Sequence, residues 1–82
     1  MKLPRDVSGR RLAQALAAFG YLPTRQTGSH LRLTTREMGE HHVTVPIQKA
    51  LPTGTLRAII KDIAQHCHLA PDEVVRRLLP GL

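Results

Sequence analysis

The second half of the chain contains one strongly amphipathic segment, which limits the folds open to the rest. From Thr53-Gly54-Thr55 onward, apolar residues recur at the 3.6-residue spacing of an α-helix. They form one continuous stripe: Leu56, Ile59, Ile60, Ile63 and Cys67. Such a helix is stabilised mainly by packing its apolar face against other elements. The sequence therefore predicts a helix that lies on a sheet, beside a second helix.

A first helix is predicted from Gly9 to about Ala18, because apolar residues again follow the helical period. They are Leu12, Ala15, Leu16 and Phe19. Ser8 can cap the start of this helix, and Gly20 suits its end. The opposite face carries Arg10 and Arg11, which we interpret as solvated surface, with a phosphate contact as the alternative.

Three short strands are predicted between these helices. The segment Tyr21–Gln26 contains Pro23, which cannot donate a hydrogen bond to a neighbouring strand, so we place it at an edge of the sheet. Thr27-Gly28-Ser29 makes a hairpin turn into a second strand at His30–Thr35, and His42–Pro46 forms the third. The order predicts an α+β fold, with a three-stranded antiparallel sheet and helices packed on one face.

A short third helix is predicted from Asp72 to Leu79, with Pro71 in its first turn. Leucines at the end of the chain either complete the core or offer a docking surface; they are Leu78, Leu79 and Leu82. We expect one domain over residues 1–82, with its core at about 3–69 and a helical extension at 70–82.

The hairpin turn and the strand after it bring together the residues that we expect to carry the chemistry. Because side chains alternate along a strand, His30 and Arg32 point away from the core. Gly28 permits a positive φ, and Ser29 offers a hydroxyl and a backbone N–H beside the ring. The candidates for the same face on the third strand are His42 and Thr44. This combination suits the binding of an anion.

The charge balance points to a polyanionic partner. The 82 residues include 12 Lys and Arg against 6 Asp and Glu, which gives a formal net charge of +6. Nucleic acid is the first candidate and an acidic protein surface is the second. With one Tyr, one Phe and no Trp, the chain cannot build aromatic platforms for stacking bases. We therefore expect recognition of backbone and shape over recognition of bases.

The single cysteine, Cys67, excludes an intrachain disulfide and fits a reducing compartment. The N-terminal residues lack the apolar run of a signal peptide, and no stretch approaches the roughly 20 apolar residues of a membrane span. We expect a cytoplasmic protein without membrane association.

Five histidines raise the question of a metal site, but their spacing argues against one. His41 and His42 are adjacent on a strand and point to opposite faces, while His66 and His68 diverge on a helix. We interpret the last two as surface residues near a helix C-terminus. The sequence also lacks a glycine-rich phosphate loop, a nucleophile elbow and a paired carboxylate motif. We therefore expect neither a metal nor another cofactor.

Several segments, in this order, resemble the HicA (YcfA-like) toxins of bacterial and archaeal HicA–HicB toxin–antitoxin systems. The resemblance covers Leu3 to about Leu69. The matching segments are Leu3–Gly9, Phe19-Gly20-Tyr21, Arg25–His30, Val43–Pro46 and Gly54–Ile59. It implies a fold like that of double-stranded-RNA-binding domains, a translation-dependent mRNA interferase activity, and a HicB antitoxin that covers the active site.

The resemblance also implies that His30, in Gly-Ser-His, is the catalytic residue. This chain departs from many members at one place, because Gln48 stands where they have a histidine shortly after Val-Pro. Glutamine cannot titrate, so a second acid–base role there would be lost or would move to His42.

Double-stranded-RNA-binding domains contact RNA through the first helix, a hairpin loop and the start of the last core helix. Free N–H groups at such a helix start can hold a phosphate. The corresponding RNA-binding candidates here are Arg10, Arg11, Arg25, Gly28, Ser29, Arg32, Lys49, Thr53, Gly54, Thr55, Arg57 and Lys61.

We expect metal-independent cleavage, with His30 as the general base that takes the proton of a ribose 2′-OH. The charge on the phosphorane would be stabilised by Arg32, or by Arg57 together with the Gly28 or Ser29 amide. Two other classes stay open. One is a non-catalytic RNA-binding module of the same fold, and the other is a basic module that binds an acidic protein.

Overall fold

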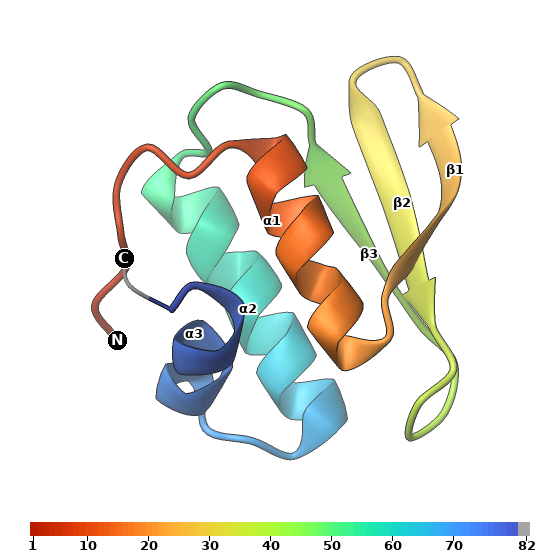
Figure 1. The fold of residues 1–82 in the computed structure, drawn as a ribbon, viewed down its shortest axis with the longest axis vertical. Coiled ribbons are helices and arrows are strands. Elements are labelled where there is room, and N and C mark those ends of the chain that lie inside the picture. Colours follow the sequence, from red (N-terminus) through yellow and green to blue (C-terminus); the bar gives the residue numbers. More distant parts are fainter. Residues whose placement is uncertain (81–82) are drawn as a thin grey trace.

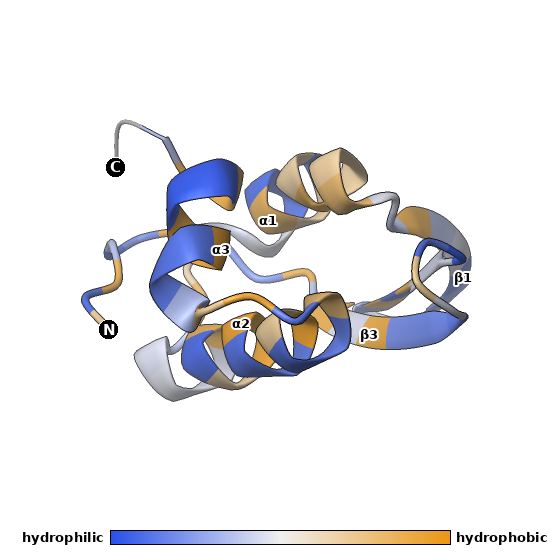
Figure 2. Ribbon diagram, turned by 90° about the horizontal axis from the view of Figure 1, so that it is seen from below, coloured by the Kyte–Doolittle hydropathy of each residue, from blue (hydrophilic) through white to orange (hydrophobic). Residues whose placement is uncertain are grey.

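Two helices cover one face of a three-stranded sheet, and a third helix packs on the side away from β1 (Figures 1 and 2). The computed structural model describes residues 1–80, so Leu82 lies outside the described residues. The elements are α1 (Gly9–Ala15), the 3-10 helix η1 (Leu16–Phe19), β1 (Leu22–Thr27), β2 (His30–Thr35), β3 (His41–Pro46), α2 (Thr53–Cys67) and α3 (Pro71–Leu78). The predicted α+β fold is confirmed.

The sheet has the order β1-β2-β3, and both strand pairs are antiparallel. The strand that contains Pro23 lies at an edge, as predicted, and all six of its residues are exposed. The β1–β2 turn is shorter than expected. Thr27 pairs with His30, so the turn consists of Gly28 and Ser29 alone, and Gly28 has a φ of 57°. This difference of one residue determines which β1 side chains face the candidate site.

The core lies between the sheet and the helices. From the sheet it takes Leu33, Val43 and Val45, and from the helices Leu12, Leu16, Leu56, Ile59, Ile60, Ile63, Val74 and Leu78. The predicted stripe of α2 is therefore buried, apart from Cys67, which is half-buried. Leu78 and Leu79 are also buried, so they complete the core.

The first helix begins as predicted but does not stay α-helical to Ala18. The Ser8 hydroxyl accepts a hydrogen bond from the Arg11 N–H at 3.0 Å and caps α1. The chain then tightens into η1 at Leu16, and Gly20 ends it in the left-handed conformation with a φ of 78°. A tightened last turn is common at the ends of helices.

Tyr21, His41 and Asp62 form a hydrogen-bonded chain that ties β3 and the residue before β1 to α2. The Tyr21 hydroxyl lies 2.7 Å from Nδ1 of His41, and Nε2 of His41 lies 3.1 Å from Oδ1 of Asp62. Burial raises the pKa of the Tyr21 phenol, and nearby Cys67 and Asp62 raise it further. The phenol therefore keeps its proton, and the His41 ring bridges the Tyr21 hydroxyl and the Asp62 carboxylate.

His66 lies in the last turn of α2, as predicted, but it makes contacts that a surface position does not imply. Its ring is half-buried and stacks on His41, with the ring centroids 4.5 Å apart. Its Nε2 lies 3.0 Å from the Glu37 carbonyl oxygen, which accepts the hydrogen bond. The β2–β3 turn folds over the end of α2, a contact that helical periodicity does not reveal. His68 is exposed, as predicted.

None of the described helices has the length and apolar character that a membrane span requires.

The start of α1 is in close contact with the end of β3. A Cβ atom at Gly9 would overlap the Pro46 carbonyl oxygen. The Gly9 N–H donates to the Gln48 carbonyl oxygen at 2.9 Å, and the Leu51 N–H donates to the Val7 carbonyl oxygen at 2.8 Å. The segment before α1 and the segment after β3 are thus held together, and glycine is required at the point of contact.

Gly9→Ala tests this requirement. A Gly-to-Ala change inside a helix normally gains roughly 0.5–1 kcal/mol. Here we expect the added methyl group to lower the free energy of unfolding by about 1–3 kcal/mol, because the backbone must shift. Urea denaturation measures the change. The control is Gly54→Ala in the first turn of α2, where a Cβ would meet nothing within 4 Å. Equal stability of the two variants would contradict the close contact.

Candidate active site and nucleic-acid interface

His30 is the first residue of β2 and its side chain is exposed. It pairs with Pro46, the last residue of β3. The preceding Ser29 accepts a hydrogen bond through its carbonyl oxygen from the Ile47 N–H at 2.6 Å. The end of β3 therefore fixes the backbone of this candidate catalytic residue, although the adjacent turn is exposed.

A shallow cavity of about 210 Å³ surrounds His30 on the open face of the sheet. Its lining consists of Arg25, Thr27, His30, Arg32 and Thr44. Three of the predicted site residues, Arg25, His30 and Arg32, are therefore brought together. Thr44 lies where strand alternation predicted it. Thr27 also lines the cavity, although the sequence predicted it in the turn.

A β-bulge in β1 changes which of its side chains face the core and which face this cavity. Residues four apart on a regular strand share one face. Tyr21 is buried, yet Arg25 lines the cavity on the opposite face. The pairing shifts between Pro23 and Arg25, which leaves Thr24 as the extra residue. The Thr24 hydroxyl lies 2.9 Å from the Thr34 hydroxyl, so it too is on the open face.

Arg25 and Arg32 are directly opposite each other on neighbouring strands. Within residues 1–80, neither guanidinium forms an ion pair with a carboxylate. Like charges that face each other across a sheet are destabilising, and each such pair changes stability by roughly 0.2–1 kcal/mol. An anion between them would relieve the repulsion and form charge-assisted hydrogen bonds. The cavity thus combines an imidazole with two cations suited to a phosphate.

His42 does not join His30. It pairs with Thr34, four residues along β2 from His30, and this separation corresponds to about 14 Å along a strand. Nδ1 of His42 lies 2.7 Å from the Thr34 hydroxyl, and Nε2 lies 3.5 Å from a Glu40 carboxylate oxygen. The expectation that His42 could take over a second acid–base role is therefore not supported by its position.

Gln48 faces a different cavity, on the other side of the Pro46–Ile47 segment. This second cavity measures about 250 Å³ and is lined by Ser8, Arg10, Ile47, Gln48 and Lys49. It contains two more of the predicted RNA-binding residues, Arg10 and Lys49. Both side chains are exposed.

The other predicted RNA-binding residues line neither cavity. Thr53, Gly54 and Thr55 form the first turn of α2, where the N-cap residue Pro52 supplies no side-chain hydrogen bond. The predicted basic residues outside the two cavities are exposed on α1 and α2: Arg11, Arg57 and Lys61. Figure 1 shows the hairpin turn and the starts of α1 and α2 at the same end of the molecule. The candidates at the helix starts therefore share an end of the fold with the hairpin turn without forming one site, and Lys61 lies in the middle of α2.

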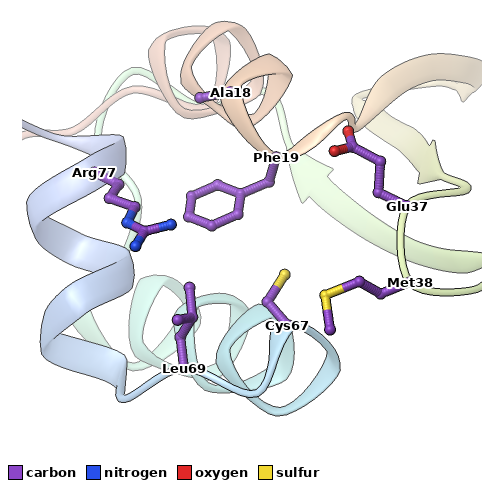
Figure 3. Close-up of a pocket in the computed structure, with 7 residues that line it drawn as sticks. All are labelled: Ala18, Phe19, Glu37, Met38, Cys67, Leu69 and Arg77. Carbon is purple, nitrogen blue, oxygen red and sulfur yellow. The ribbon is translucent and has the colours of Figure 1, made fainter.

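A more apolar cavity of about 260 Å³ lies among η1, the β2–β3 turn, the end of α2 and α3 (Figure 3). Its lining residues are Ala18, Phe19, Glu37, Met38, Cys67, Leu69 and Arg77. Burial, and then the charge of Glu37, raise the pKa of the Cys67 thiol, which disfavours the thiolate. The cysteine is therefore poorly suited to act as a nucleophile. The described part of the chain also has no group of three or more His, Cys, Asp or Glu side chains placed to hold a metal ion.

Arg25→Gln tests the charge repulsion at the His30 cavity. We expect the variant to be more stable than the parent at low ionic strength, by about 0.2–1 kcal/mol, because one of two facing charges is removed. Urea denaturation at low and high salt measures this gain, which should shrink as salt screens the pair. Arg36→Gln serves as the control, since Arg36 lies beyond the end of the strand ladder. A loss of stability in Arg25→Gln but not in the control would contradict repulsion.

Comparison with known proteins identifies the family. Residues 9–64 match the model of the family described as the HicA toxin of bacterial toxin–antitoxin systems. The match spans all three strands, α1 and most of α2, and so includes the His30 cavity. Neither the comparison with curated proteins nor the comparison with solved structures gave a match. Because the matched residues make up more than half of the chain, it belongs to the HicA toxin family.

Proposed function

We propose that this protein is a cytoplasmic endoribonuclease that cleaves mRNA, with His30 as its catalytic residue. The observation that carries the proposal is the exposed imidazole in one cavity with Arg25 and Arg32, two guanidiniums without acidic partners among residues 1–80. Histidine changes its charge near neutral pH more readily than other side chains, which suits it to proton transfer. A phosphate held by the two cations places the neighbouring ribose within its reach.

The reaction that fits these groups is an internal transfer at phosphorus. The His30 imidazole takes the proton of the ribose 2′-OH, and the 2′-oxygen forms a bond to phosphorus. The bond from phosphorus to the 5′-oxygen breaks, and the imidazolium returns its proton to that oxygen. The products are a 2′,3′-cyclic phosphate and a 5′-OH. Arg25, Arg32 and the Gly28 or Ser29 N–H groups stabilise the charge that develops on the phosphorane.

We expect a slow nuclease. One acid–base residue typically contributes roughly 10² to 10⁴ in rate. The other residues that line the cavity are arginines and threonines, which are side-chain types that do not serve as general bases. The single imidazole must therefore act both as the base and as the acid.

The family places this chain in a toxin–antitoxin context, and we propose that its protein partner is a HicB-like antitoxin in a hetero-oligomeric complex. The net charge of +6 favours an acidic segment of the partner at the His30 cavity. Such a segment would compete with RNA for Arg25 and Arg32 and would inhibit the toxin directly.

His30→Ala should abolish cleavage. We expect the parent protein to stop bacterial growth and to shorten mRNA when it is induced without its antitoxin, and the variant, at equal expression, to do neither. The control is His42→Ala, which removes another exposed histidine from the same face of the sheet but outside the cavity. Loss of cleavage in the control as well would remove the special role of His30.

Purified protein then tests the chemistry. A 2′-deoxy substitution at the cleaved nucleotide should prevent cleavage, because it removes the attacking hydroxyl, and EDTA should have no effect. Cleavage that disappears with EDTA and returns with a divalent metal ion would refute the mechanism. RNA that is bound in a salt-sensitive way but keeps its full length would identify a binding module, and negligible RNA affinity would favour an acidic protein partner.

A further inference from the structure

We propose that the second cavity, between Arg10 and Lys49, binds another phosphate of the RNA strand that His30 cleaves. The substrate is then a single strand that passes from this cavity around the end of β3 into the His30 cavity. This inference rests on the proposed ribonuclease function and adds to it a second binding site and a substrate class.

The charge and chemistry of the second cavity suit a phosphate. Arg10 and Lys49 supply two cations, and neither forms an ion pair with a carboxylate within residues 1–80. Gln48 contributes an amide that can donate and accept hydrogen bonds but cannot transfer protons. The cavity therefore has the groups to bind an anion and lacks an acid or base for catalysis.

The two cavities share one rigid support. Pro46 is opposite His30 at the first cavity, and the next residue, Ile47, lines the second. The Ile47 N–H donates to the Ser29 carbonyl oxygen at 2.6 Å. On the far side, Gly9 packs against the Pro46 carbonyl oxygen, which fixes the first turn of α1 and with it Arg10. The backbone segments that line the two cavities are thus held against each other.

The course between the cavities favours a flexible strand over a duplex. Arg32 lies on the open face of the sheet, whereas Arg10 belongs to a helix packed against the opposite face. The RNA must therefore bend around the end of β3. A single strand bends readily, while a double helix is stiff over tens of base pairs. With one Tyr, one Phe and no Trp, binding depends on phosphates more than on stacked bases.

RNA length provides the test. Binding is measured by fluorescence anisotropy on full-length His30→Ala protein, which does not consume its substrate. The probes are a trinucleotide, long enough for the His30 cavity alone, and a dodecanucleotide, long enough for both cavities. The additional variants are Arg10→Gln and Lys49→Gln. The charge-matched control is Arg36→Gln, at the other end of β2 from His30.

We expect Arg10→Gln and Lys49→Gln to weaken binding of the dodecanucleotide several-fold and to leave the trinucleotide unchanged. The dependence of log K on log salt should fall by about 0.7 for each phosphate that the variant no longer neutralises. The control should change neither quantity. Unchanged binding of the long RNA, equally weakened binding of both RNAs, or binding of a duplex at least as tight as that of the single strand would overturn the proposal.

Cleavage by the parent protein is assayed separately. If Arg10→Gln and Lys49→Gln weaken binding of the long RNA alone but the parent protein cleaves no RNA, the second binding site stands and the nuclease proposal is refuted. If the parent protein cleaves RNA but the two variants bind the long RNA as well as the His30→Ala protein does, the nuclease proposal stands and phosphate binding in the second cavity is refuted.

Discussion

The contact between Gly9 and the Pro46 carbonyl oxygen determines how the two halves of the chain meet. It seats the first turn of α1 on the end of β3, and the end of β3 in turn holds Ser29 and His30 through backbone pairing. A turn of two exposed residues would otherwise be mobile, since its side chains have few packing partners. The end of the molecule that carries the candidate site is therefore ordered by backbone contacts and needs no buried side chain of its own.

The open face of the sheet illustrates a compromise between stability and binding. Arg25 and Arg32 oppose each other without a carboxylate in residues 1–80 to neutralise them, which is unfavourable in the unliganded protein. The core on the other face is continuous and compensates for this cost. Because RNA and an acidic protein segment would both relieve the same repulsion, each would exclude the other from the cavity. Under the proposed function, an antitoxin would need no conformational change of the toxin to block this cavity.

The helices, the core and the position of His30 could be predicted from the sequence, because each depends on a local period of apolar residues. The stripe on α2 and the alternation from His30 onward are examples. The partner of Arg25 could not be predicted in this way. A three-residue turn would have placed Arg25 opposite Leu31, on the core face, whereas the two-residue turn places it opposite Arg32. The stacking of His66 on His41 likewise depends on how a distant turn folds.

The bulge at Thr24 separates the part of the chain that faces the core from the part that faces the open side of the sheet. Between the buried Tyr21 and the exposed Arg25, β1 changes phase by accommodating one extra residue at a free edge of the sheet. In a chain without Thr24 this segment could form a regular strand, and Tyr21 and Arg25 would still lie on opposite faces of the sheet. Deletion of Thr24 would thus leave Tyr21 on the core face and Arg25 on the open face of the sheet.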